Sequence, residues 1–147
     1  MNAKDHEILS ELERDGRITN LALAAKVGLS PSACLRRVQD MERSGVIAGY
    51  RVVTDRVALG VGFIAYIAVG LSDHSKAAQR AFERAVAQAV QVRECHNVTG
   101  TIEYILRVEV ADIGAYKSFH TDVLGTLPAV HALTTYVVLD STKDLRA

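Results

Sequence analysis

A tight glycine turn between two short helical segments constrains the fold of this chain more than any other feature. Residues 27–32 read Val-Gly-Leu-Ser-Pro-Ser. Gly28 is typical of the end of a helix. Ser30 can cap the next helix, and Pro31 suits its first position, where the missing amide hydrogen costs nothing. Two helices joined by so short a turn are typical of a helix-turn-helix motif.

Two further helical signals precede this turn. Asn2 can cap a first helix, with Asp5 at the capping-box position. A second helix is predicted over residues 21–27, with Thr19 or Asn20 as its cap. Together with the helix that starts at residue 31, these segments predict a small three-helix unit.

The residues that follow the third helix predict a small hairpin. That helix continues to about Ser44 and ends at Gly45. The next apolar residues suggest two short strands with a turn at Ala48-Gly49. These residues are Val46, Ile47, Tyr50, Val52 and Val53. The N-terminal part is therefore predicted to be a winged helix-turn-helix.

From residue 61 onward the pattern changes to a slower alternation of strands and helices. Strands are predicted at residues 63–71, 92–99, 104–110 and 130–139, and helices at 75–90 and after the capping residue Asp112. The order β-α-β-β-α-β is that of the ferredoxin-like fold. The chain is therefore expected to be an α+β protein.

These patterns divide the chain into a helix-turn-helix domain at residues 1–54, a linker at 55–61 and a ferredoxin-like domain at 62–147. The most apolar segment, 57–71, carries no charge and is shorter than the roughly 18 residues that suggest a membrane span. No basic segment followed by an apolar one opens the sequence. We therefore expect a cytoplasmic protein with no membrane partner.

The first strand of the second domain is apolar on both faces. Residues 63–69 read Phe-Ile-Ala-Tyr-Ile-Ala-Val, and residues 136–139 are nearly as apolar. Two helices can cover only one face of a four-stranded sheet, and an open face normally alternates with polar residues. The uncovered face therefore needs another cover. A second copy of the same sheet, which predicts a homodimer, is one solution, and the chain's own N-terminal domain is the alternative.

The third helix carries candidate DNA contacts. Residues 31–56 hold five arginines against three acids, a local balance of +2 in a chain whose formal net charge is zero. Cys34, Leu35, Val38 and Met41 are predicted to face inward. The candidate contacts to double-stranded DNA are Ser30, Pro31, Ser32, Ala33, Arg36, Arg37, Asp40 and Arg43. A solvated basic face with no DNA partner is the alternative interpretation.

The sequence closely resembles the Lrp/AsnC (feast/famine) family of regulators. The resemblance to the family's N-terminal domain lies in residues 16–20, 27–38 and 45–50, and that to its effector domain in residues 94–100, 127–130 and 134–138. It covers essentially the whole chain. It implies a transcription regulator, not an enzyme, whose dimers often assemble into octamers. It also implies a response to a small-molecule effector, an amino acid or related metabolite.

In that family the effector sits between dimers, near the turn that joins the second and third strands. The resemblance points to a set of candidate effector-binding residues: Asn97, Val98, Thr99, Gly100, Thr101, Glu103, Tyr104, Leu124, Gly125, Tyr136, Val137 and Val138. Backbone amides around Gly100 suit a carboxylate, and Glu103 suits an α-ammonium group. The alternative is a plain hairpin turn with a solvated glutamate.

Three positions depart from the family's usual pattern. The family commonly has an acidic residue directly after the turn glycine and an aspartate two residues further on, where this chain has Thr101 and Glu103. Gly125 stands where larger residues are usual. These departures bear on which effector is recognised and not on the fold.

Two other functions are alternatives for a chain of this kind. The sirohaem decarboxylases resemble this family in fold, and His96 or His120 would be the candidate residues for such chemistry. However, no nucleophile-base grouping is apparent. An architectural DNA-wrapping protein would need little sequence preference and no effector. Cys34 and Cys95 lack zinc-ligand spacing, so no metal is predicted. They are expected to be inert core residues, with redox sensing as the alternative. No cofactor is predicted.

Overall fold

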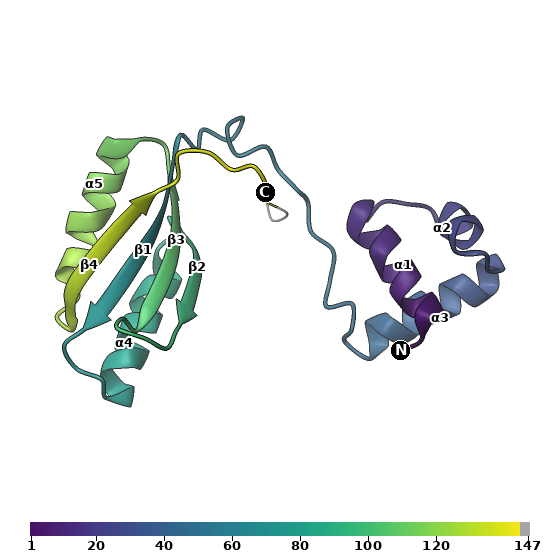
Figure 1. Ribbon diagram of the computed structural model, residues 1–147, viewed down its shortest axis with the longest axis horizontal. Coiled ribbons are helices and arrows are strands. Elements are labelled where there is room, and N and C mark those ends of the chain that lie inside the picture. The colour runs from purple at the N-terminus through teal and green to yellow at the C-terminus, as the bar shows by residue number, and fades with distance from the viewer. Residues whose placement is uncertain (145–147) are drawn as a thin grey trace. The chain divides into compact units, whose positions relative to one another are not determined.

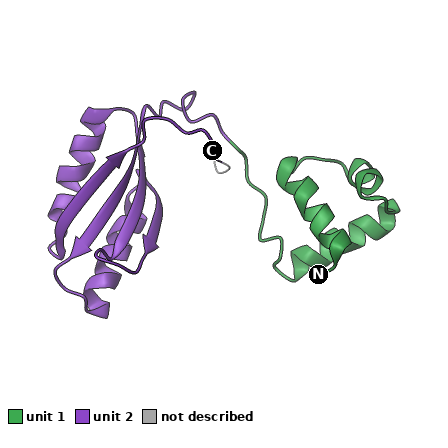
Figure 2. Cartoon of the chain, viewed as in Figure 1, with its two compact units in different colours: residues 1–53 green, residues 54–147 purple. Residues whose placement is uncertain are grey.

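The computed structural model describes residues 1–144, which form two compact units with a boundary between Val53 and Thr54 (Figure 2). Residues 55–61, predicted as a linker, form a turn that belongs to the second unit. The amide of Val61 donates to the carbonyl of Arg56 (2.9 Å), and the amide of Gly62 donates to that of Val110 (3.1 Å). None of the helices in the described part of the chain is long and apolar enough to cross a membrane.

The first unit consists of α1 (Ala3–Arg14), α2 (Asn20–Val27) and α3 (Pro31–Arg43). The predicted caps are confirmed: Asn2 and Asp5 form a reciprocal capping box, and Thr19 caps α2. The three helices enclose a small core made of Ile8, Leu23, Ala24, Val27, Cys34 and Met41. Each helix therefore contributes one apolar stripe to a common interior.

The predicted hairpin after α3 is wrong, because residues 46–53 contain no strand. The amide of Ile47 donates to the carbonyl of Met41 (3.0 Å), and the hydroxyl of Tyr50 donates to Glu42 (2.9 Å). The segment is thus held against the end of α3 and does not pair with itself. A two-stranded ribbon without further strands is marginal in water, and Val52 and Val53 remain exposed.

The second unit has the predicted β-α-β-β-α-β order (Figure 1). Its elements are β1 (Phe63–Leu71), α4 (Lys76–Gln88), β2 (Val92–Asn97), β3 (Tyr104–Val110), α5 (Ile113–Asp122), the short 3-10 helix η1 (Leu124–Thr126) and β4 (Val130–Val137). The sheet order is β2-β3-β1-β4 with antiparallel neighbours. This is the ferredoxin-like arrangement.

The main core lies between the sheet and the two helices α4 and α5. Alternate residues of β1, Ala65, Ile67 and Val69, are fully buried on that side. Phe82 of α4 and Phe119 of α5 pack into the same cluster. The residues between them on β1 point to the opposite side of the sheet, since strand side chains alternate. That opposite side is called the open face below.

The two ends of the sheet carry different segments. At one end, Leu71 of β1 is paired with Val130, beside the turn at residues 98–103; this end is called the turn end. At the other end, called the linker end, Phe63 pairs with Val110 and follows residues 55–61. Strand β4 therefore runs from the turn end to the linker end.

Candidate functional site

Local sequence signals define the start of α3. Gly28 has φ +66° and ends α2 in the left-handed conformation that favours glycine. The hydroxyl of Ser30 accepts a hydrogen bond from the amide of Ala33 (3.3 Å), and Pro31 is the first helical residue. The side-chain amide of Asn20 on α2 donates to the carbonyl of Pro31 (2.8 Å). The hydrogen bond to Ser30, directly before α3, and the hydrogen bond from Asn20 on α2 therefore hold the first turn of α3 in place.

The outward face of α3 follows a regular helical spacing. Ser32, Arg36, Gln39 and Arg43 are all exposed and stand four, three and four residues apart. Arg36 makes no ion pair with any residue in the described chain, whereas Arg43 pairs with Asp40 on its own helix. Gln39 was missed by the sequence interpretation. Its signal was the helical phase, since it lies midway between Arg36 and Arg43 on the same stripe.

Two predictions of side-chain direction on α3 are wrong. Leu35, predicted to face inward, is 45% exposed. Arg37, predicted to face outward, is half-buried and its guanidinium lies 2.8 Å from a carboxylate oxygen of Asp5 on α1. The cause is the packing of α3 against α1 and α2, which centres the buried stripe on Cys34 and Met41.

Asp5 links α1 to α3. The amide of Asn2 donates to its carboxylate (2.8 Å), and Arg37 pairs with the other oxygen. The hydrogen bond from Asn2, followed by that from Arg37, holds the pKa of Asp5 below its ordinary value. The carboxylate is therefore ionised at neutral pH, and Arg37 supports the position of α3.

At the turn end of the second unit, residues 98–103 form the predicted turn between β2 and β3. The amide of Val98 and the side-chain amide of Asn97 both donate to the carbonyl of Glu103 (2.9 and 3.1 Å). Gly100 has φ +132°, with nothing near the position where a Cβ atom would be. Thr99 and Thr101 beside it are exposed. The turn therefore presents its backbone to solvent.

The carboxylate of Glu103 is directed back at the sheet. One oxygen accepts a hydrogen bond from the amide of Leu71 (2.6 Å), and the other lies 3.0 Å from Nδ1 of His74. His74 was not among the predicted site residues. Nothing in the sequence pairs residues 71–74 with residue 103, because the contact depends on how β1 and β3 are paired.

The predicted effector residues fall at both ends of the sheet. Leu124 and Gly125 form η1 directly before β4, which starts at the turn end. Leu124 is a fully buried core residue. Tyr136 pairs with Tyr66, and Val137 with Ala65, close to the linker end. From Leu71 to Ala65 along β1 is six residues, or roughly 20 Å. One chain therefore does not bring residues 136–138 to the turn.

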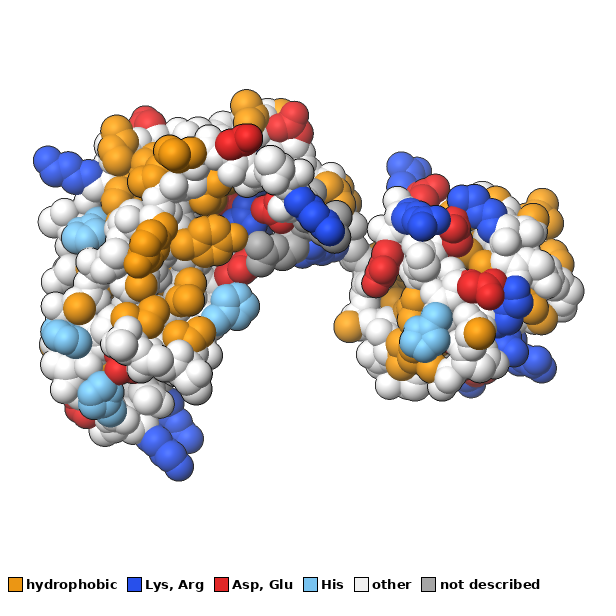
Figure 3. All heavy atoms as spheres, in the orientation of Figure 1, with side chains coloured by type: hydrophobic (Ala, Val, Ile, Leu, Met, Phe, Trp, Pro, Cys, Tyr) orange, Lys and Arg blue, Asp and Glu red, His pale blue; other side chains and the backbone are white. Residues whose placement is uncertain are grey.

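The open face of the sheet has an apolar half along β1 and β4. Ile64, Tyr66 and Ala68 of β1 are only partly buried, and Tyr136 of β4 is 61% exposed. Figure 3 shows hydrophobic side chains gathered on one side of the second unit. Apolar surface of this kind marks interaction sites in soluble proteins. The structure therefore agrees with the expectation that one chain leaves this face incompletely covered.

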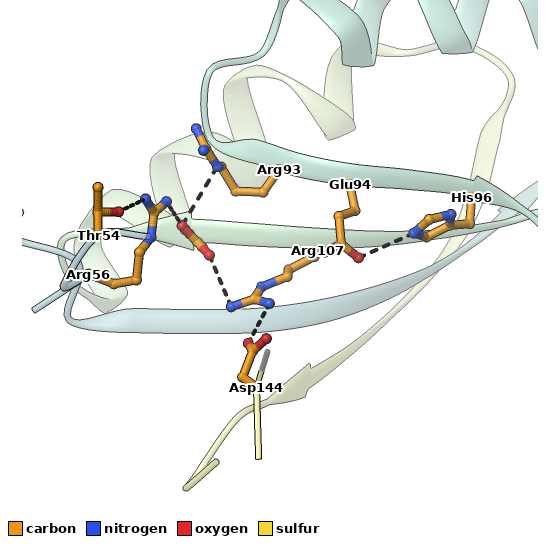
Figure 4. Close-up of polar contacts among 8 residues, drawn as sticks. Thr54, Arg56, Arg93, Glu94, His96, Arg107 and Asp144 are labelled. Atoms are coloured by element: carbon orange, nitrogen blue, oxygen red, sulfur yellow. Dashed lines mark hydrogen bonds and ion pairs between the residues drawn. The ribbon is translucent and has the colours of Figure 1, made fainter. Parts of the chain in front are cut away.

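The other half of the open face is an ion cluster (Figure 4). Glu109 of β3 pairs with Arg56, with Arg107 (3.1 Å) and with the more distant Arg93 (3.8 Å). Asp144 pairs with Arg107 at 2.7 Å. Residues from both ends of this unit therefore meet on the sheet, and the charges of Arg107 and Glu109 are buried with partners, as buried charges require.

Cys95 lies outside the core, contrary to expectation. It is exposed on β2, whereas Cys34 is buried as predicted. Cys95 lines an open groove of about 500 Å³ between α4 and β2, together with Glu83 and Tyr104. The hydroxyl of Tyr104 donates to Glu83 (2.8 Å). Burial, followed by this hydrogen bond, raises the pKa of Tyr104 to about 12. The phenol is therefore neutral at physiological pH.

The two histidines considered for enzymatic chemistry lie on opposite sides of the sheet. His96 is on the open face, where its Nε2 lies 3.2 Å from Glu94. His120 is on α5 and contacts the ring of Tyr116. Within residues 1–144, no three His, Cys, Asp or Glu side chains are grouped as metal ligands. The geometry does not combine His96 and His120 in one site.

Comparison with known families covers both units. A family described as winged helix-turn-helix DNA-binding matches residues 1–48, and the Lrp/AsnC ligand binding domain matches residues 64–147. The leucine-responsive regulatory proteins of Salmonella typhimurium and Escherichia coli K12 are each 37% identical to this chain over 140 residues. The matches cover 95% of this chain and 85% of theirs.

Solved structures agree with these matches. A transcriptional regulator from Neisseria meningitidis, solved as its L-Met complex, has a TM-score of 0.94 and 30% identity, covering 98% of this chain and 93% of that one. An AsnC family regulator from Agrobacterium tumefaciens has a TM-score of 0.93 and 29% identity, covering 98% and 94%. These relatives are named as regulators and not as enzymes. The chain therefore belongs to the Lrp/AsnC family of transcription regulators, with a helix-turn-helix for DNA and a ligand-binding domain.

Proposed function

We propose that α3 reads operator DNA through its outward stripe of Ser32, Arg36, Gln39 and Arg43. The observation that carries the proposal is that these four polar side chains are exposed on one side of a helix whose other side is buried. Arginine pairs with guanine edges and glutamine with adenine edges in the major groove, while serine donates to either bases or phosphates. The exposed stripe therefore has the chemistry of base reading.

The remaining predicted contacts have supporting roles in this proposal. Ser30, Pro31 and Ala33 belong to the start of α3, where the first turn of a recognition helix approaches DNA. Asp40 pairs with Arg43 and directs its guanidinium. Arg37 holds α3 against Asp5. We therefore assign direct contact to the outward stripe and orientation to Asp40 and Arg37.

A homodimer formed through the open face would place two copies of α3 on one DNA. The partly exposed apolar half of that face, with Tyr66 and Tyr136, supports a second copy as its cover. Two-fold symmetry predicts half-sites about one helical turn apart, roughly 34 Å, or a multiple of that. The regulator would then act on chromosomal DNA in the cytoplasm.

The effector is proposed to be an amino acid that binds at the turn end. The exposed backbone around Gly100 can bind its carboxylate, and the carboxylate of Glu103 can accept its ammonium group. The L-Met complex of the Neisseria meningitidis regulator supports this ligand class. Residues 136–138 lie near the other end of the sheet. Their part in the response would therefore require contact between chains, as in an assembly of dimers.

The experiment is binding to the protein's own upstream promoter DNA at fixed salt, with and without a panel of free amino acids, following complex size as well as affinity. Selective binding that changes with one amino acid would support the whole proposal. Selective binding that ignores the panel would retain the DNA-reading role and reject the amino-acid effector. Equal affinity for promoter and unrelated DNA would reject sequence-specific reading.

A further inference from the structure

The carboxylate of Glu103 has two partners that differ in mobility. The amide of Leu71 is part of the backbone where β1 ends, and it donates to one oxygen at 2.6 Å. His74 lies on the loop between β1 and α4, and its side chain is 70% exposed, against 18% for Glu103. The backbone donor is therefore fixed, whereas the imidazole can rotate into solvent.

We propose that His74 is a specificity-determining residue that an amino-acid effector must displace. Its imidazole contacts the carboxylate oxygen of Glu103 that would otherwise accept the α-ammonium group of the ligand. The fixed donor on the other oxygen keeps the carboxylate aimed at the same place when His74 leaves. This inference rests on the proposed effector site. It adds that the side chain of His74 competes with the ligand for the carboxylate of Glu103.

The test is calorimetric titration of the full chain with L-leucine and with L-methionine at one fixed pH. His74→Gln should bind both amino acids about two- to fivefold more tightly than wild type, the scale of an exposed ion pair. His131→Gln, the matched control in β4, should keep the wild-type affinity.

A second ligand separates competition from a structural effect. The keto analogue of leucine, 4-methyl-2-oxopentanoate, has no ammonium group and need not displace His74. Its affinity should be the same for wild type and His74→Gln. If the substitution weakened both ligands alike, His74 would support the fold or touch the ligand, and the proposal would be wrong.

Glu103→Gln completes the series. It removes the charge that attracts the ammonium group, so L-leucine and L-methionine should bind weakly. If neither amino acid bound wild type or His74→Gln, the displacement scheme would be overturned. Promoter binding, measured separately on the same proteins, would then still decide whether the chain reads DNA.

Discussion

Separate replacement of Arg36 and Arg37 by alanine tests the assignment of the reading face. The two arginines are neighbours in the sequence but have different surroundings. Arg36 is exposed with no ion pair among the described residues, whereas Arg37 is half-buried 2.8 Å from Asp5. We expect Arg36→Ala to weaken DNA binding and Arg37→Ala to weaken mainly the packing of α3 against α1.

The two effects differ in size. A bidentate contact to a base is worth about 1–3 kcal/mol, so Arg36→Ala should raise the Kd by about tenfold or more per half-site. If Arg36 contacts a phosphate instead, Arg36→Ala should make the slope of log K against log salt concentration less steep by about 0.9. Arg37 would have to leave Asp5 to reach DNA, exchanging one anion for another. Its loss should change the Kd by less than about threefold.

The assay is fluorescence anisotropy with operator DNA over a range of salt concentrations, combined with thermal unfolding of each variant. Arg37→Ala should lower the midpoint of thermal unfolding, and Arg36→Ala should leave it unchanged. Gln39→Ala serves as a second probe of the same stripe and should relax preference at one base position. Equal loss of DNA binding in Arg36→Ala and Arg37→Ala, with equal thermal stability, would refute the assignment.

Three further predictions concern assembly, packing and pH. If the protein forms the proposed homodimer, Tyr136→Asp should convert it to a monomer in analytical ultracentrifugation, because it puts a charge on the apolar half of the open face; an unchanged dimer would reject that interface. Ile67→Ala should lower the free energy of unfolding in urea by about 2–5 kcal/mol, since the side chain is fully buried; a loss below about 1 kcal/mol would contradict the packing described. Asp5→Asn should destabilise the protein at neutral pH, because the amide of Asn2 and then Arg37 hold the pKa of Asp5 below its ordinary value. That difference should disappear as the pH falls through the lowered pKa, and a difference independent of pH would exclude the mechanism.

The fold could be predicted where the signals are local. Ser30 with Pro31, and Asp112 before α5, mark helix starts through hydrogen bonds within a few residues, and the structure has them there. The hairpin after α3 failed because apolar residues such as Val52 indicate an extended chain but not whether a partner strand exists. Strand pairing depends on a partner segment elsewhere in the chain, and the sequence of one segment does not show whether that partner exists.

The sites could be predicted only in part, since their geometry depends on contacts between distant segments. Helical spacing predicted the polar side of α3, but its exact phase depends on packing against α1 and α2, with Arg37 paired to Asp5 and Leu35 left exposed. The family resemblance pointed to Glu103. It did not indicate that its carboxylate lies against Leu71 and His74, about thirty residues earlier in the chain.

The ion cluster on the open face decides where the ligand-binding domain can be cut. Arg56 lies before the first strand and Asp144 lies beyond the last, yet both complete the charges around Glu109 and Arg107. A shortened domain that began at Phe63 or stopped at Val137 would contain every strand and helix of the fold. It would also remove one of the three arginine partners of Glu109 or one of the two carboxylate partners of Arg107, and buried ions depend on such partners. A fragment intended to fold independently should therefore begin before Arg56 and extend beyond Asp144, outside the bounds of its first and last strands.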